Sequence, residues 1–327
     1  MRYLLRRIGF YLVALWVAVT LNFLIPRLMP GDPVLLLVAK LQGKLDPHAI
    51  EGLRLQFGLD THESLWTQYL RYLGDISHGN FGLSINYYPT PVSEVLGSAL
   101  IWTLVLVGIS TILSFILGTA LGAVAAWKRG SWFDTTFSPL LTFFQGIPYF
   151  WLALILLFTL GFELHWFPIY GGYSIDVEPG FTPEFIGDAA YHAVLPALTI
   201  IISSVAGWML GMRNPMIATL AEDYVVMAQA KGLSERRILI TYAARNAILP
   251  NITGFAISLG FVIGGALLTE FIFSYPGIGF ILLQAVEAED YPLMQAVFLI
   301  IALAVLIANF LADVLYVALD PRVRQEG

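Results

Sequence analysis

Residues 223–250 read DYVVMAQAKGLSERRILITYAARNAILP and lie between two strongly apolar stretches of the chain. The segment holds two helical patterns that are broken at Gly232. Glycine suits the left-handed position that ends a helix, and Ser234 suits the N-cap of the helix that follows. The spacing therefore predicts a helix over residues 223–230, a sharp turn, and a second helix over residues 234–248.

The composition around this segment is that of a membrane protein. Hydrophobic residues make up 58% of the 327 residues, charged residues make up 12%, and the mean hydropathy is +0.76. Six apolar blocks approach the length of about 20 residues that a helix needs to cross a bilayer. The blocks lack the alternation in segments of about ten residues that barrel strands show, so an all-α polytopic membrane protein is predicted. The six predicted transmembrane helices cover residues 8–25, 99–127, 139–162, 194–212, 252–273 and 294–319.

Basic residues indicate the orientation of these helices. Lys and Arg occur at the N-terminus, after the second and fourth blocks, and in the tail. The connections after the third and fifth blocks contain Asp and Glu but neither Lys nor Arg. Because Lys and Arg accumulate in cytoplasmic loops, both termini and residues 223–250 are predicted to face the cytoplasm. Residues 1–7 resemble the start of a signal peptide, but no small-residue cleavage site follows, so the first block is interpreted as an uncleaved anchor.

The connections define the expected domain organisation. Two short amphipathic helices are expected in the long outer connection, one from Asp46 to Gly58 and one from Ser64 to Leu73, where Gly74 would close it. The acidic connection over residues 163–193 is expected to be a loop with at most a short helix. The predicted regions are an N-terminal anchor helix (1–29), an external connection (30–97), a core (98–320) that contains a coupling segment (221–250), and a cytoplasmic tail (321–327).

Small residues are spaced for close helix packing in three of the blocks. Two glycines four residues apart allow helix backbones to approach closely, although generic packing gives the same pattern. The first and sixth blocks lack this spacing and are expected to lie peripherally. The pairs are Gly118 and Gly122, Gly207 and Gly211, and Gly260 and Gly264.

No motif of a catalytic site is evident in the sequence. The chain lacks a phosphate-binding loop, a zinc-protease motif and a serine-nucleophile motif. It also has no cysteine, which excludes disulfides and thiolate metal sites. The histidines are scattered, so solvated or interfacial positions are favoured over an outer metal site. They are His48, His62, His78, His165 and His192, and no metal or catalytic residue is predicted among them.

Residues inside the blocks suggest a pathway. An acid within a membrane helix is a functional hypothesis by default, and Glu270 is expected either to line a pathway or to cap the turn that follows it. Asp313 is expected to be structural, near Arg322. Proton-driven transporters usually carry several such residues near the midplane, which this chain lacks. Further candidates for a gate are Gly146, Pro148 and Phe150, at a break inside the third block. The alternative interpretation is a helix kink that serves packing only.

The motif A-K-G-L-S followed by R-N-A-I-L-P resembles the coupling segment of binding-protein-dependent ABC importer permeases. The chain is most similar to the branch that imports dipeptides, oligopeptides and nickel. Stretches along the whole chain share the resemblance, including PGDPV at 30–34, GIPYFWLALIL at 146–156 and LLTEFIFSYPGIG at 267–279. At Val226 and Gln229 the chain departs from the arginines that are common in the family.

The resemblance implies a six-span type I importer permease in the inner or plasma membrane of a prokaryote. It implies as partners a second homologous permease, two cytoplasmic ABC ATPases and an external substrate-binding protein, with no nucleic acid. The ATPases would bind ATP and Mg, so this chain needs no cofactor of its own and is not an enzyme. The residues that would dock on an ATPase are Asp223, Tyr224, Ala228, Ala230, Lys231, Gly232, Leu233 and Ser234.

The function implied is inward transport by alternating access, with peptides as the expected cargo. Oligosaccharides, nickel or glutathione are alternative cargoes for the same machinery. Two alternatives come from other functional classes. One is an ATPase-independent secondary transporter or channel, and the other is an intramembrane enzyme, which would need a buried set of catalytic residues.

Overall fold

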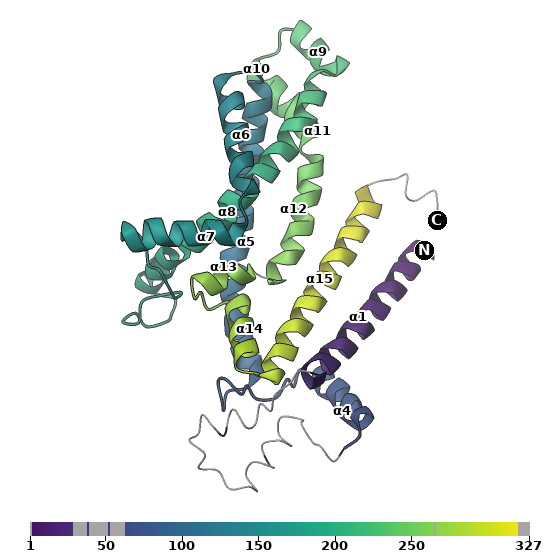
Figure 1. Cartoon of the computed structure of the whole chain (residues 1–327). Helices are drawn as coiled ribbons and strands as arrows, with labels where there is room; N and C mark the ends of the chain where they lie inside the picture. The colour runs from purple at the N-terminus through teal and green to yellow at the C-terminus, as the bar shows by residue number, and fades with distance from the viewer. Residues whose placement is uncertain (1, 29–37, 39–51, 53–62, 265, 320–327) are drawn as a thin grey trace. The chain divides into compact units, whose positions relative to one another are not determined.

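The computed structural model describes residues 2–28, 38, 52, 63–264 and 266–319, and its named elements are all helices (Figure 1). The predicted all-α membrane architecture is confirmed. Within the described residues, four helices are long and apolar enough to cross a membrane, and the bent pair of α6 with α7 and η1 adds a fifth if it counts as one span. The four are α1 (Arg2–Leu28), α5 (Val92–Trp127), α8 (Pro183–Leu220) and α15 (Tyr291–Leu319).

The predicted span over residues 252–273 is not one helix. It is divided into α12 (Leu249–Phe261), the 3₁₀-helix η3 (Val262–Gly264) and α13 (Leu267–Ile272). The 13 residues of α12 give a length of about 20 Å, short of the roughly 30 Å of a bilayer core. Gly260 and Gly264 explain the interruption, because glycine is a poor helix former.

The chain folds into two compact units. Unit 1 consists of Met1–Thr103, Ile263–Leu267 and Pro276–Gly327, and unit 2 consists of Leu104–Val262 and Leu268–Tyr275.

In unit 2, α8 is the central helix. It packs against α6 (Trp132–Gly146), α7 (Tyr149–Leu156) and α12. The α5 glycines touch it directly: a Cβ on Gly118 would lie 2.5 Å from the Trp208 Cβ, and one on Gly122 would lie 2.2 Å from the Met209 carbonyl oxygen. No side chain fits at such distances, so the predicted close packing through this glycine pair is confirmed.

The start of α8 corrects the expected loop over residues 163–193. The helix begins at Pro183, and the hydroxyl of Thr182 accepts a hydrogen bond from the Phe185 N–H (3.2 Å). An N-cap threonine followed by proline at the first helical position is a standard helix start. The glycines and prolines of the connection, which are typical of loops, obscured this signal.

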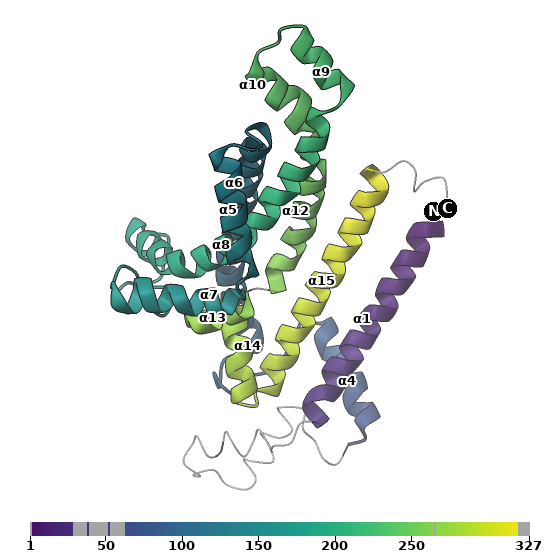
Figure 2. The same ribbon diagram turned by 45° about the horizontal axis from the view of Figure 1, so that its top comes forward.

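In unit 1, α1 and α15 lie side by side in both views (Figures 1 and 2). Helix α4 (Leu65–Ser77) packs on α1, where Tyr69 hydrogen-bonds with Thr20 (2.8 Å). The predicted helix start at Ser64 is confirmed, since Ser64 is the N-cap of α4, but Gly74 does not end the helix, which continues to Ser77. The other predicted outer helix falls almost wholly outside the described residues, and so does the tail.

The turn before α15 holds a fully buried acid, Asp290. Its carboxylate accepts hydrogen bonds from the Ser84 hydroxyl and from the N–H groups of Asn86 (2.9 Å) and Leu293 (3.1 Å). Burial, and then the charge of Asp290, raises the pKa of the nearby Tyr87 phenol. The neutral phenol donates a hydrogen bond to Gln284 in α14 (Ile278–Glu287), which fixes this outer segment on unit 1.

Candidate coupling site and transmembrane pocket

A helix–turn–helix, residues 223–247, projects from the bundle of unit 2 in both views (Figures 1 and 2); we call it the elbow. Its first arm is α9 (Asp223–Ala230), with the predicted bounds. The turn is a Schellman motif: the Leu233 N–H donates to the Ala228 carbonyl (3.3 Å), and the Gly232 N–H donates to the Gln229 carbonyl (2.9 Å). Gly232 has φ +72°, so the predicted left-handed position is confirmed.

A small apolar core fastens the two arms together. Val225, Ala228 and Ile238 are buried, and the half-buried Leu233 and Trp127 pack on them. Trp127 is the last residue of α5, so the elbow is tied to the end of a membrane helix. Leu233 was expected at the exposed tip, but it faces this core because a Schellman turn places its last residue against the helix that it ends.

The second arm departs from the regular α-helix predicted over residues 234–248. It consists of α10 (Glu235–Arg237), a π-helix η2 (Ile238–Ala244) and α11 (Arg245–Ala247). Ser234 occupies the predicted N-cap position, but its side chain makes no capping hydrogen bond.

Contacts with α8 position this arm. Ala243 and Ala247 are buried against Met212 and Met216 of α8. The π-helix has one more residue per turn than an α-helix, which changes the side chains that face α8. The arm is therefore packed along the end of a membrane helix rather than surrounded by solvent.

The outer face of α9 carries apolar side chains with few intramolecular contacts. The exposed fractions are 41% for Tyr224, 51% for Val226 and 58% for Met227. Asn246 donates a hydrogen bond to the Tyr224 hydroxyl (2.8 Å), which orients that ring. Sequence reasoning placed Met227 near one face of this helix with Tyr224 and Ala228, and it noted Val226 only as a departure from the family. Val226 and Met227 are exposed because α9 turns Val225 and Ala228 toward the buried core.

The eight residues expected to dock on an ATPase are divided by burial. Ala228 is buried and Leu233 is half-buried, so both support the elbow from inside. The other six are exposed: Asp223, Tyr224, Ala230, Lys231, Gly232 and Ser234.

The break predicted in the third span is present. Gly146 ends α6, Tyr149 begins α7, and the axes of the two helical segments differ by 99°. Gly146 and Pro148 are exposed at this bend, and Phe150 is half-buried in the first turn of α7.

Glu270 lies in α13 and is fully buried. Its backbone carbonyl accepts a hydrogen bond from the Tyr275 N–H (2.8 Å) and closes the turn after α13. The backbone of Glu270 thus belongs to the turn, and its side chain does not border open space.

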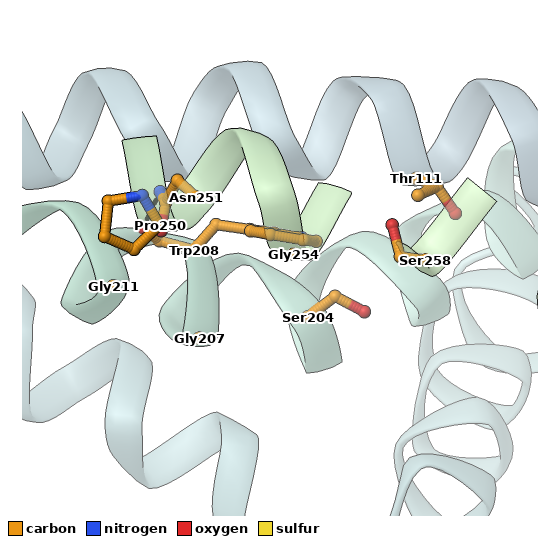
Figure 3. Close-up of a pocket in the computed structure, with 9 residues that line it drawn as sticks. All are labelled: Thr111, Ser204, Gly207, Trp208, Gly211, Pro250, Asn251, Gly254 and Ser258. Carbon is orange, nitrogen blue, oxygen red and sulfur yellow. Dashed lines mark hydrogen bonds between the residues drawn. The ribbon is translucent and has the colours of Figure 1, made fainter. Parts of the chain in front are cut away.

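An open pocket of about 540 Å³ lies between α5, α8 and α12 (Figure 3). Thr111 and Ser258 lie at one end, Pro250 and Asn251 at the other, and the Trp208 side chain extends between them. The remaining lining residues are Ser204, Gly207, Gly211 and Gly254. Sequence reasoning missed this pocket because its residues come from three helices.

Asn251 joins the helices at its end of the pocket. Its amide donates to the Thr119 hydroxyl of α5 (3.0 Å) and to the Trp208 carbonyl of α8 (2.9 Å). A Cβ on Gly211 would lie 2.3 Å from the Asn251 Oδ1, so a larger residue there would displace the Asn251 amide. Asn251 follows directly on the coupling segment and connects it to the bundle.

Comparison with known proteins agrees with this architecture. Residues 118–325 match the family of binding-protein-dependent transport system inner membrane components. The chain is 35% identical to the oligopeptide transport system permease protein AppB of Bacillus subtilis, covering 98% of each protein. It is 34% identical to the di/tripeptide transport system permease protein DppB of Pseudomonas aeruginosa, covering 99% of each. The dipeptide transport system permease protein DppB of Escherichia coli is 33% identical over 100% of this chain and 99% of the relative. The chain therefore belongs to the family of binding-protein-dependent transport system inner membrane components, the permease subunits of ABC transporters.

Proposed function

We propose that this chain is the permease subunit of an ABC importer that moves peptides inward by alternating access. The observation that carries the proposal is the elbow: a rigid helix–turn–helix with an exposed apolar face, packed on the ends of α5 and α8. A structure of this kind transmits motion only if it is stiff and fixed to the elements that it moves. Its two arms share a buried core, which supplies that stiffness.

The elbow would receive its motion from a cytoplasmic ATPase. Tyr224, Val226 and Met227 give α9 an apolar surface, and Lys231 adds a positive charge beside it. The other exposed docking residues would surround this surface. The complex would contain two ATPases, which bind ATP and Mg, a second homologous permease, and an external substrate-binding protein.

The cargo follows from the relatives. Three of them are named as transporters of oligopeptides, of di- and tripeptides, and of dipeptides. Peptides are therefore the proposed cargo of this chain. The bend at Gly146 and Pro148 is proposed as a gate beside the pathway.

The charge distribution supports an orientation with both termini in the cytoplasm of a prokaryote. Lys and Arg occur at the N-terminus, after the second and fourth predicted spans and in the tail, whereas the connections after the third and fifth contain Asp and Glu but neither Lys nor Arg. In this orientation the elbow meets the ATPases, and the acidic connections meet the external binding protein.

The test uses the absence of native cysteine. Met227→Cys and, as a control, Arg129→Cys each place one thiol at an exposed position of unit 2. After purification in mild detergent, a co-purifying ATPase should cross-link to the thiol of the Met227→Cys variant and not to that of the Arg129→Cys variant. Purification without any ATPase, together with peptide uptake that needs no ATP, would support the secondary-transporter alternative instead.

A further inference from the structure

The pocket between α5, α8 and α12 contains hydrogen-bond donors that the protein leaves unused. Among the described residues, no hydrogen bond is formed by the Thr111 hydroxyl, the Ser204 hydroxyl or the Trp208 indole N–H. The three groups come from two helices and line one space of about 540 Å³. The three residues are half-buried at this pocket, so a molecule inside it can supply acceptors to their donor groups.

Other polar groups of the pocket are already engaged. The Ser258 hydroxyl donates to the Phe255 carbonyl in its own helix (2.8 Å), and the Asn251 amide bonds to Thr119 and Trp208. The pocket thus combines polar groups with a structural role and polar groups without one.

The chemistry of the lining limits the ligand. No charged residue lines the pocket, so neither a carboxylate nor an ammonium group finds a counter-ion there. The free groups include two hydroxyls and an indole N–H, which donate to oxygen acceptors. The carbonyl oxygens of a peptide main chain are uncharged acceptors at regular spacing. The volume lies within the roughly 300–1,000 Å³ that is usual for small-molecule sites.

We propose that this pocket holds part of a passing peptide and hydrogen-bonds its main-chain carbonyl oxygens through Thr111, Ser204 and Trp208. The inference rests on the proposed function and adds to it the site and the mode of contact. Hydrogen bonds to the main chain do not depend on the side chains of the peptide. A permease of this kind accepts many sequences and leaves selection to other components.

The pocket lies beside the bend of the third span. A Cβ on Gly207 would lie 3.3 Å from the Nε2 of Gln145, the residue before Gly146. Movement of α6 at its bend would therefore change the wall of the pocket at Gly207. This contact places the proposed peptide contacts next to the proposed gate.

The first test removes the two free hydroxyls. Thr111→Val with Ser204→Ala keeps the side-chain shapes close to the originals and should lower tripeptide uptake by the assembled complex about tenfold, as expected for two lost hydrogen bonds. The control Ser203→Ala removes a hydroxyl of α8 that is already bonded within its own helix and does not line the pocket, and it should leave uptake near the unaltered level. Co-purification of the ATPase verifies that each variant assembles. Unchanged uptake by an assembled double variant would overturn the proposed contacts.

The second test measures occupancy directly. Ser204→Cys provides the only thiol of this permease, and a small maleimide should label it in the assembled complex. A tripeptide that the complex is transporting should slow the labelling several-fold, whereas a neutral oligosaccharide should not. Labelling that ignores the peptide would overturn the inference, and so would slowing by the oligosaccharide alone. A thiol that is unreactive without peptide would also overturn it, because a neighbouring subunit would then fill the pocket.

The two proposals fail in distinguishable ways. If the unaltered complex takes up no peptide, the proposed function fails, and the pocket inference fails with it. If the unaltered complex takes up peptide and the pocket variants do too, only the pocket inference fails.

Discussion

Each unit of the protein joins two helices with an arginine–aspartate pair, and the two pairs differ in burial and geometry. In unit 2, Arg213 of α8 binds Asp134 of α6 through two contacts, Nε to Oδ1 (2.6 Å) and Nη2 to Oδ2 (2.9 Å). In unit 1, Arg7 of α1 binds Asp313 of α15 through Nη1 to Oδ2 (2.8 Å). The side chain of Asp134 is 5% exposed and that of Asp313 is 21% exposed.

The partners of the two acids also differ. Asp134 accepts further hydrogen bonds from the N–H of Gly130, in the turn before α6, and from the hydroxyl of Ser138 in α6 (3.0 and 3.2 Å). Asp313 accepts one further bond, from the Tyr11 hydroxyl (2.6 Å). Arg213 directly follows Met212, on which the second arm of the elbow packs. The more buried of the two pairs therefore lies at the base of the elbow.

Breaking the buried pair should have the largest effect on stability. In Arg213→Met, Asp134 keeps its charge in a buried site without its main counter-ion, which should lower the free energy of unfolding by about 3–5 kcal/mol. Thermal unfolding of the purified protein in detergent measures the loss.

The control for this prediction removes both charges. Asp134→Leu combined with Arg213→Met leaves no buried charge and should restore much of the lost stability. If the single variant proves as stable as the unaltered protein, the pair carries no structural weight, and the contrast between the units disappears.

Asn251 should rank second. Asn251→Ala leaves the Thr119 hydroxyl and the Trp208 carbonyl without their partner and should lower the free energy of unfolding by about 1–3 kcal/mol. Thr253→Ala is the matched control, because the Thr253 hydroxyl donates only to the Leu249 carbonyl of its own helix (3.1 Å). Similar losses in the two variants would contradict the role of Asn251 in joining α5, α8 and α12.

Gly232 should show a smaller effect on stability but a specific effect on transport. Gly232→Val forces a β-branched residue into a left-handed conformation at a cost of about 1–2 kcal/mol. The strain should reshape the turn, and peptide uptake should fall to background while the protein still inserts into the membrane.

Gly130 offers a control of the same backbone type. It has φ +77°, close to the +72° of Gly232, and a Cβ at either position would meet no atom within 4 Å. Gly130→Val should thus cost similar stability but retain uptake, because it lies between α5 and α6 and outside the elbow. Equal uptake by the two variants would remove the elbow from the mechanism.

Local signals in the sequence predicted the elbow well. The features in question depend only on residues that are close in sequence. They are the helix over residues 223–230, the turn at Gly232 and the N-cap position of Ser234. The break at Gly146 and Pro148 was predictable for the same reason. The helix start at Thr182 was missed although its capping signal is local, because composition was given more weight than position.

Features that join distant parts of the chain were not predictable in this way. Asp134 and Arg213 are far apart in sequence, and no periodic pattern relates them. Asp313, which was expected to be structural, forms an ion pair with Arg7 of the distant helix α1, and the expected neighbour Arg322 lies outside the described residues. The pocket needs three helices in their packed positions before its free hydroxyls come together.

The exposed pair of unit 1 should show the smallest effect and so completes the comparison. In Asp313→Asn, the amide oxygen still accepts a hydrogen bond from Tyr11 or Arg7, and the charge of Arg7, whose side chain is 40% exposed, is solvated. Partly exposed ion pairs contribute about 0–1 kcal/mol, so the thermal unfolding of this variant in detergent should differ little from that of the unaltered protein. High salt should weaken the pair in the unaltered protein and narrow even that difference, while Arg213→Met should stay unstable at every salt concentration. A loss for Asp313→Asn as large as that for Arg213→Met would show that burial does not set the strength of these links.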